Sequence, residues 1–204
     1  RAVSHDREHH PGALRLGRSL LAVTLTPGGG LSAGFDEPLA MLGACHDRVR
    51  ASLALLQRLQ AHLAAHSNDA DARSAAHDVR RYFNLAAPAH HEDEERHVLP
   101  LLQASGEVEA VAIAAQLLTD HRRLRQLWME LDAMLARVEA GHPAPSLALW
   151  QAVHDFVALH EQHLALEDGQ AFPCFERLAA PRGAAHLDAM GREMAERRGV
   201  TPPY

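Results

Sequence analysis

The sequence predicts an all-α protein built around an up-down-up-down four-helix bundle. Three observations support this fold class. Hydrophobic residues make up 47% of the 204-residue chain and aromatic residues only 4%, so leucine and alanine, which favour helices, supply much of the core. Hydrophobic side chains recur every three or four residues along four long segments, which is typical of amphipathic helices. Short connections separate these segments and make neighbouring helices antiparallel.

The chain is expected to divide into three parts. Residues 1–35 form an N-terminal extension, which is partly flexible because Pro27–Gly30 interrupts regular structure. Residues 36–180 form the four-helix bundle. Residues 181–204 hold a short C-terminal helix, over about residues 181–197, and a proline-rich tail. This short helix either covers the bundle or mediates formation of a homodimer.

The first predicted helix begins near Asp36, and its hydrophobic face includes one histidine, His46. The helix ends near Ser67-Asn68-Asp69. Asp69 belongs to the residue types that cap a helix N-terminus, so it also marks the start of the next helix.

The second predicted helix spans about residues 70–102 and contains Pro88. A proline inside a helix removes one backbone hydrogen bond and bends the helix. This bend lies two residues before His90, where it re-aims the side chains that follow.

The third predicted helix spans about residues 107–140 and places His121 among hydrophobic residues. Gly141 ends it, as glycine commonly does after a helix. The fourth predicted helix begins at Ser146 and carries His163 on its hydrophobic face.

The second and fourth helices share a phrase in which a histidine stands four residues before a glutamate, and the glutamate six residues before a proline. The phrase reads His90, Glu94 and Pro100 in one helix and His163, Glu167 and Pro173 in the other. Residues four apart lie on one face of an α-helix, so each phrase directs an imidazole and a carboxylate to the same side. Two such helices packed face to face would surround a pair of metal ions.

A histidine on a hydrophobic helix face is costly unless its nitrogens find partners. Burying Glu94 and Glu167 together would strongly raise their pKa values unless cations lie between them. Imidazoles and carboxylates together suit first-row transition metals such as iron, manganese or zinc. The predicted metal ligands are His46, His90, Glu94, His121, His163 and Glu167.

The chain resembles the hemerythrin-like, HHE cation-binding family over about residues 36–178. The resemblance rests on Cys45-His46-Asp47, His90-His91-x-x-Glu94-Glu95, Asp120-His121 and His163-x-x-x-Glu167-Asp168, in this order. It implies a four-helix bundle that holds a non-heme di-iron centre, with both glutamates as bridges between two iron ions. Zinc or manganese is the alternative metal.

The chain departs from the oxygen-carrying members of this family on the third helix. Those members have a second histidine one turn along, where this chain has Arg125, and Leu117 lies on the other side of His121. The site therefore resembles a version with four histidines and two glutamates. Fewer nitrogen ligands leave more open positions, which disfavours reversible oxygen carriage and favours chemical turnover.

Several neighbouring side chains remain alternatives. Asp168 lies five residues after His163 and is a second candidate for the bridge. His160 lies on the same face one turn earlier and either supplies a fifth nitrogen or serves hydrogen bonding and packing. His91 and Glu95 adjoin the predicted pair and are candidates to exchange roles with it.

The resemblance implies that the protein binds or senses dioxygen, nitric oxide or redox state, with dioxygen or another small diatomic or peroxide molecule as its ligand. An enzyme acting on peroxide or ferrous iron is one alternative. A structural or regulatory metal-binding module is another.

Composition excludes other classes of function. The net charge of -6 and the lack of a clustered basic face argue against nucleic-acid binding. No apolar run approaches the roughly 20 residues that span a bilayer, and the apolar stretch at residues 20–25 is too short for a signal peptide. Cys45 and Cys174 form no CxxC motif and are expected to be reduced thiols, so the chain is predicted to be cytoplasmic and not to bind membranes.

Overall fold

The computed structural model describes residues 34–143 and 146–200. Within these ranges the regular structure is helical throughout, which confirms the predicted all-α fold class. The predicted N-terminal extension lies outside the described residues, apart from its last two positions. None of the described helices is both long and apolar enough to cross a membrane.

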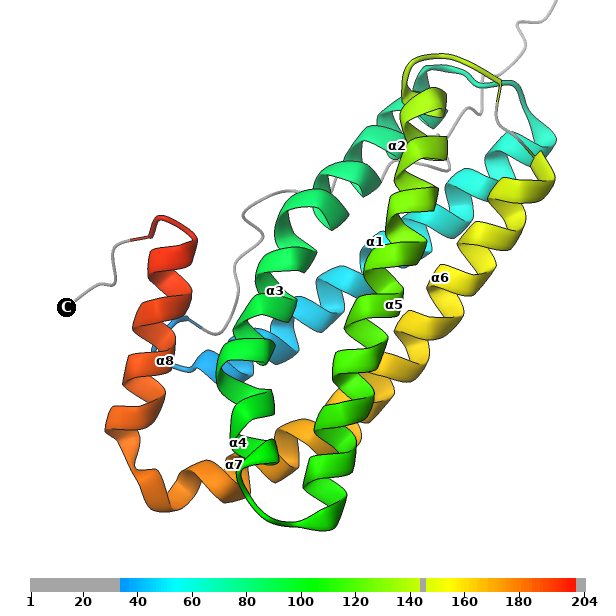
Figure 1. Ribbon diagram of the computed structural model, residues 1–204. Helices are drawn as coiled ribbons and strands as arrows, with labels where there is room; N and C mark the ends of the chain where they lie inside the picture. Colours follow the sequence, from blue (N-terminus) through cyan, green and yellow to red (C-terminus); the bar gives the residue numbers. More distant parts are fainter. Residues whose placement is uncertain (1–33, 144–145, 201–204) are drawn as a thin grey trace, which may run out of the picture.

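Four long helical segments form the bundle (Figure 1). They are α1 (Pro38–Ala65), a second segment made of α2 (Ala70–Arg81), α3 (Ala87–Asp93) and α4 (Leu99–Gln103), then α5 (Val108–Glu139), and a fourth made of α6 (Ser146–Leu166) and α7 (Phe172–Ala179). Helix α1 packs against α2 and α6, and α5 packs against the same two helices. The four segments therefore enclose one common interior.

The ends of the segments follow from local residue chemistry. The side chain of Asp69 accepts a hydrogen bond from the backbone N–H of Ala72, as a helix N-cap does. At the end of α5, Gly141 adopts a positive φ of 84°, and His142 donates its N–H to the Arg137 carbonyl. This arrangement satisfies carbonyl groups that the helix end leaves without partners.

The second and fourth segments contain π-helical turns, in which the helix is wider but continues. The second segment has two, Tyr82–Ala86 and Glu94–Val98, and the fourth has one, Glu167–Ala171. After each turn, one residue donates its N–H to the carbonyl five positions earlier, and a proline follows at once. The donors are Ala87, Leu99 and Phe172, and the prolines are Pro88, Pro100 and Pro173. Because a proline ring clashes with the carbonyl four residues before it, a widened turn lets the helix continue through the proline.

The interior has two hydrophobic clusters with a polar layer between them. One cluster contains Leu53, Phe83, Leu131 and Phe156, and the other contains Leu42, Val98, Leu117 and Phe175. On every one of the four segments, the predicted site residues stand between members of the first cluster and members of the second. The fold therefore places these polar side chains at one level of the bundle.

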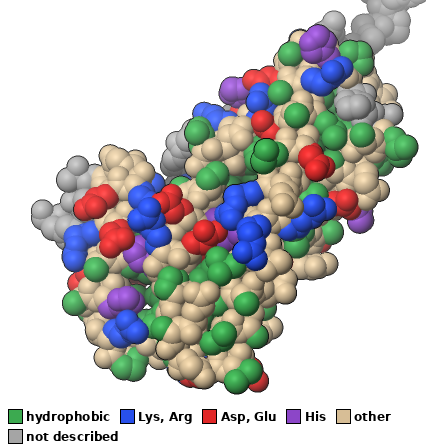
Figure 2. Space-filling model, viewed as in Figure 1, with side chains coloured by type: hydrophobic (Ala, Val, Ile, Leu, Met, Phe, Trp, Pro, Cys, Tyr) green, Lys and Arg blue, Asp and Glu red, His purple; other side chains and the backbone are tan. Residues whose placement is uncertain are grey.

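Helix α8 (Ala184–Arg197) confirms a helix in the C-terminal part of the chain and lies against the outside of its own bundle, beside α1 (Figure 1). Gly191 of α8 approaches the backbone of Phe35 so closely that a β-carbon there would lie 1.8 Å from the carbonyl oxygen. The outer surface in this view carries basic and acidic side chains interspersed with hydrophobic ones (Figure 2).

Candidate metal centre

The structure brings all six predicted site residues together in the polar layer. His46 comes from α1, His90 from α3 and His121 from α5, while His163 closes the layer from α6. Glu94 and Glu167 are the first residues of two π-helical turns. Each of the six side chains is at most 2% exposed.

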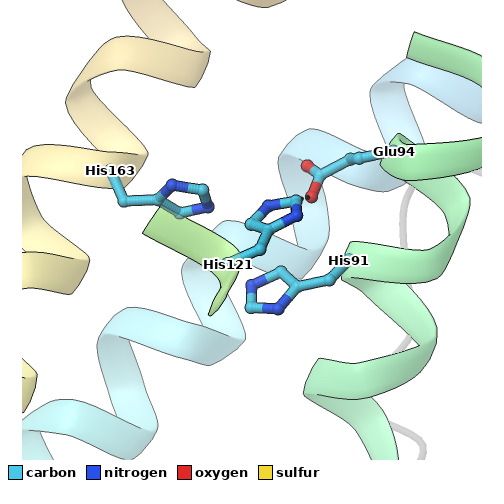
Figure 3. A group of neighbouring side chains, drawn as sticks. All are labelled: His91, Glu94, His121 and His163. Atoms are coloured by element: carbon cyan, nitrogen blue, oxygen red, sulfur yellow. Dashed lines mark ion pairs between the residues drawn. The ribbon is translucent and has the colours of Figure 1, made fainter. Parts of the chain in front are cut away.

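The side chains form two groups whose ligand atoms lie within 4.8 Å of one another. The two-histidine group consists of His46, His90, Glu94 and Glu167. The three-histidine group consists of His91, Glu94, His121 and His163, which converge from three helical segments in Figure 3. Glu94 belongs to both groups, so they are adjacent.

Each buried carboxylate presents one oxygen to each group. The Oε1 atom of Glu94 lies 3.2 Å from Nε2 of His90, and its Oε2 atom lies 3.5 Å from Nε2 of His121. The Oε2 atom of Glu167 lies 3.2 Å from Nε2 of His46, and its Oε1 atom lies 3.0 Å from Nε2 of His163. Both glutamates therefore stand where a carboxylate bridging two cations would stand.

These atoms are buried without hydrogen-bond partners among the described residues. Both carboxylate oxygens of Glu94 and Glu167 lack a partner, and so does Nε2 of His121 and of His163. Unpartnered buried polar atoms are rare and costly, because each has lost its hydration without compensation. A cation in each group would satisfy these atoms at once, so the residues present fit a pair of metal ions.

The charges in this layer also suit cations. Burial lowers the pKa of His46 and of His121, but the nearby carboxylates of Glu167 and Glu94 outweigh burial and raise both values to about 10. Burial raises the pKa of the two glutamates, yet the surrounding imidazoles lower both values overall. Both carboxylates are therefore ionised, and either protons or cations must balance them.

Two more carboxylates hold the outer nitrogens of the imidazoles. Nδ1 of His46 donates to Asp168 at 2.7 Å, and Arg50 pairs with the same carboxylate at 2.5 Å. When a cation replaces the proton on Nε2, a histidine that donates Nδ1–H in this way directs the lone pair of Nε2 to the metal. Asp168 thus lies outside both groups, and the alternative that it replaces Glu167 as the bridge is wrong for this geometry.

The same arrangement recurs across the site. Nδ1 of His121 donates to Glu95 at 2.9 Å, and Arg125 pairs with Glu95 at 3.0 Å. Glu95 therefore orients His121 and does not exchange roles with Glu94. Arg125, which occupies the place of the missing histidine, holds that orienting carboxylate.

His91 is the site residue that the six-residue prediction omits. It is 9% exposed, and its ring stacks on His121 with centroids 4.2 Å apart. Burial and the neighbouring imidazoles hold its pKa well below the ordinary value, so the ring is neutral and able to ligate. The two groups thus bring together five histidines and two glutamates, one histidine more than the six predicted ligands.

Three other residues near the polar layer, His160, Tyr82 and Cys45, belong to neither group. Nδ1 of His160 donates to the Phe156 carbonyl at 3.0 Å, so His160 has the hydrogen-bonding and packing role. Burial raises the pKa of the Tyr82 hydroxyl and of the Cys45 thiol, and both remain protonated. Cys45 and Cys174 are free thiols in this structure.

Two comparisons with known proteins concern the segment that contains these two groups. A protein of Haemophilus influenzae described as uncharacterized is 29% identical over 168 residues, which cover 82% of this chain and 94% of that protein. The family model of the hemerythrin HHE cation-binding domain matches residues 37–175, with a second match over residues 112–200. Since this match covers most of the bundle and the site, the chain belongs to the hemerythrin HHE cation-binding family.

Proposed function

We propose that this protein holds a non-heme di-iron centre and uses it to bind or sense dioxygen, nitric oxide or redox state. The two ligand groups that share Glu94, with buried and unpartnered carboxylate oxygens, carry this proposal. The proposed ligands are His46, His90, His91, Glu94, His121, His163 and Glu167. A mixture of imidazoles and carboxylates suits iron, and zinc and manganese accept the same donors.

The two groups offer unequal numbers of nitrogen donors. His91, His121 and His163 supply three nitrogens to one group, while His46 and His90 supply two to the other. The two-histidine group therefore leaves more room for a small exogenous ligand. When bound, a reduced di-iron pair would supply open positions for dioxygen, nitric oxide or peroxide, and the electrons that reduction of dioxygen or peroxide requires.

The side chains that surround the polar layer limit which molecules reach the proposed centre. The hydrophobic clusters above and below the polar layer exclude bulk water, and they favour small uncharged molecules over ions. Asp168 and Glu95 fix the imidazoles of His46 and His121 by hydrogen bonds, so the nitrogens remain aimed inward.

We expect protein purified without nickel affinity to contain about two iron ions per chain, one for each ligand group. If the centre binds dioxygen, anaerobic reduction followed by air should produce an absorption band that disappears on degassing and returns on re-oxygenation. Elemental analysis and absorption spectroscopy test these outcomes, with His154→Ala, a change at an exposed histidine, as the control. Protein without bound metal, or irreversible bleaching in air, would contradict the proposal.

An enzyme acting on peroxide or ferrous iron is the second candidate, because the unequal groups leave open positions where a substrate attaches. Steady-state turnover of peroxide by the iron-loaded protein, compared with His121→Ala, separates this candidate from binding alone. Equal rates in the two proteins would remove the enzymatic alternative.

A further inference from the structure

A cavity of about 140 Å³ lies beside the three-histidine group, between the second segment, α5 and α6. Aromatic and aliphatic side chains supply most of its lining. They include Phe83, Leu124, Trp128 and Phe156, while His91 and His160 are the imidazoles at its wall. Glu95 and Arg125 also border the cavity, but they pair with each other and Glu95 also accepts from His121.

His160 gives this cavity a polar group whose tautomer and charge can be assigned. Its ring is 3% exposed and packs against Phe156 and Phe83, with centroids 4.3 Å and 5.5 Å away. Nδ1 lies 3.0 Å from the Phe156 carbonyl, which only accepts hydrogen bonds, so the proton of the neutral ring is on Nδ1. Burial lowers the pKa of His160 to about 3, and the ring therefore stays neutral near pH 7.

The remaining ring nitrogen of His160 is an acceptor. A neutral imidazole with its proton on Nδ1 carries a lone pair on Nε2. No hydrogen-bond partner for this Nε2 is found within residues 34–143 and 146–200. An unpaired acceptor at the wall of an apolar space favours a molecule that brings a single hydrogen-bond donor on an apolar body.

We propose that this cavity binds a small aromatic alcohol of the phenol class, with its ring among Phe83, Trp128 and Phe156 and its hydroxyl donating to Nε2 of His160. The size is suitable, because an apolar cavity of about 150 Å³ holds benzene. The aromatic side chains favour a planar ring through stacked and edge-on contacts. This site goes beyond the proposed metal function, since binding uses His160 and not the ligand groups.

Other classes of ligand fit the cavity less well. An ion would lose its hydration without a free counter-charge, because Arg125 already pairs with Glu95, and Glu92, which also lines the cavity, pairs with Arg96. A hydrocarbon would fill the space but leave Nε2 of His160 without a donor. A bound phenol satisfies both requirements, and its ring would lie next to His91, a proposed metal ligand.

The matched pair of phenol and toluene tests the site, because the two molecules differ only in a hydroxyl and a methyl group. Trp128 lines the cavity and Trp150 lies outside it, so a Trp150→Phe background makes Trp128 the fluorescent reporter. We expect the as-purified protein, titrated without oxygen, to bind phenol about tenfold more tightly than toluene. In His160→Phe the preference should reverse to toluene, because the acceptor is gone while a ring of similar shape remains.

Ala87→Leu is a second variant, since Ala87 lines the cavity and a larger side chain there should abolish binding of both molecules. Thermal melting confirms that each variant is folded. Toluene binding more tightly than phenol to the unmodified site would overturn the proposal, as would binding of neither. Phenol binding that chelation abolishes and His160→Phe leaves intact would also overturn it, because phenol would then ligate the metal. A chain that binds phenol but no iron would contradict the di-iron proposal alone.

Discussion

On the second and fourth segments, the spacing between a histidine and the buried glutamate separates the histidines of the two groups from His160. His90 and His91 precede Glu94 by four and three residues, and both spacings put a side chain on the same helix face as the glutamate. His160 precedes Glu167 by seven residues, two turns away, and its Nδ1 donates to its own helix. His90 and His91 therefore belong to the ligand groups, whereas His160 lines a cavity.

We expect His91→Leu to reduce the bound metal from about two ions to about one per chain, because the three-histidine group loses one of its nitrogens. The matched control is His154→Leu, since the side chain of His154 is 77% exposed and lies outside both groups. Elemental analysis of both variants gives the stoichiometry. An undiminished metal content in His91→Leu would show that this histidine is not a ligand.

The sequence was sufficient to predict six of the seven side chains that meet in the polar layer, because helical spacing fixes which residues of one helix share a face. The sequence offers His91 only as an alternative to His90, although its spacing from Glu94 allows both. The hydrogen bonds from His46 to Asp168 and from His121 to Glu95 join different helical segments. No pattern within one helix predicts such contacts.

Among the elements, two of the three π-helical turns, Glu94–Val98 and Glu167–Ala171, account for the repeated spacing of glutamate and proline. The sequence predicted helices over residues 70–102 and 107–140, and the structure has them over residues 70–103 and 108–139. The bend expected at Pro88 is a widened turn just before that proline. Sequence periodicity did not reveal this, because one widened turn changes the phase of the hydrophobic pattern by only one residue.

Helix α8 is joined to the bundle through a buried carboxylate. Asp93, which precedes Glu94, is fully buried and accepts from Nε of Arg197 at 2.9 Å and from Arg198 at 2.6 Å. An ionised carboxylate in such a position depends on its hydrogen-bond donors. This contact attaches the C-terminal helix directly behind the proposed ligands.

We expect Arg197→Ala to lower the free energy of unfolding by about 1–3 kcal/mol, because a buried acceptor loses a donor. Arg177→Ala is the control, since the pair of Arg177 and Glu107 is exposed and its loss should cause no measurable change. Urea denaturation at saturating metal measures both variants. Equal stabilities for the two would show that Asp93 does not need Arg197.

For the whole molecule, the polar layer divides the hydrophobic interior, and the bundle depends on what balances its two buried carboxylates. A metal that binds only the folded chain stabilises it by about 2.7 kcal/mol at a free concentration one hundred times its dissociation constant. The proposed centre is therefore also a structural link among all four helical segments.

We expect chelation to lower the melting temperature, and metal added back to restore it in proportion to the logarithm of its concentration. Because protons compete with cations for the imidazole nitrogens, the difference between loaded and chelated protein should shrink as the pH is lowered. Differential scanning calorimetry at several pH values measures this. A melting temperature indifferent to chelation would contradict metal binding to the folded chain.

The widened turn at Glu94–Val98 also determines how the chain tolerates changes in length. A π-helical turn holds one residue more than the regular helix, so loss of a single residue there would leave α3 and α4 facing the same way as before. It would also bring the Pro100 ring against the carbonyl four residues earlier, which the widened turn avoids. Loss of one residue from the middle of α5 would instead rotate everything after it by about 100°, turning buried side chains towards water. Loss of one residue at Glu94–Val98 is therefore expected to cost the strain at Pro100, whereas the same loss in α5 misplaces half of a helix.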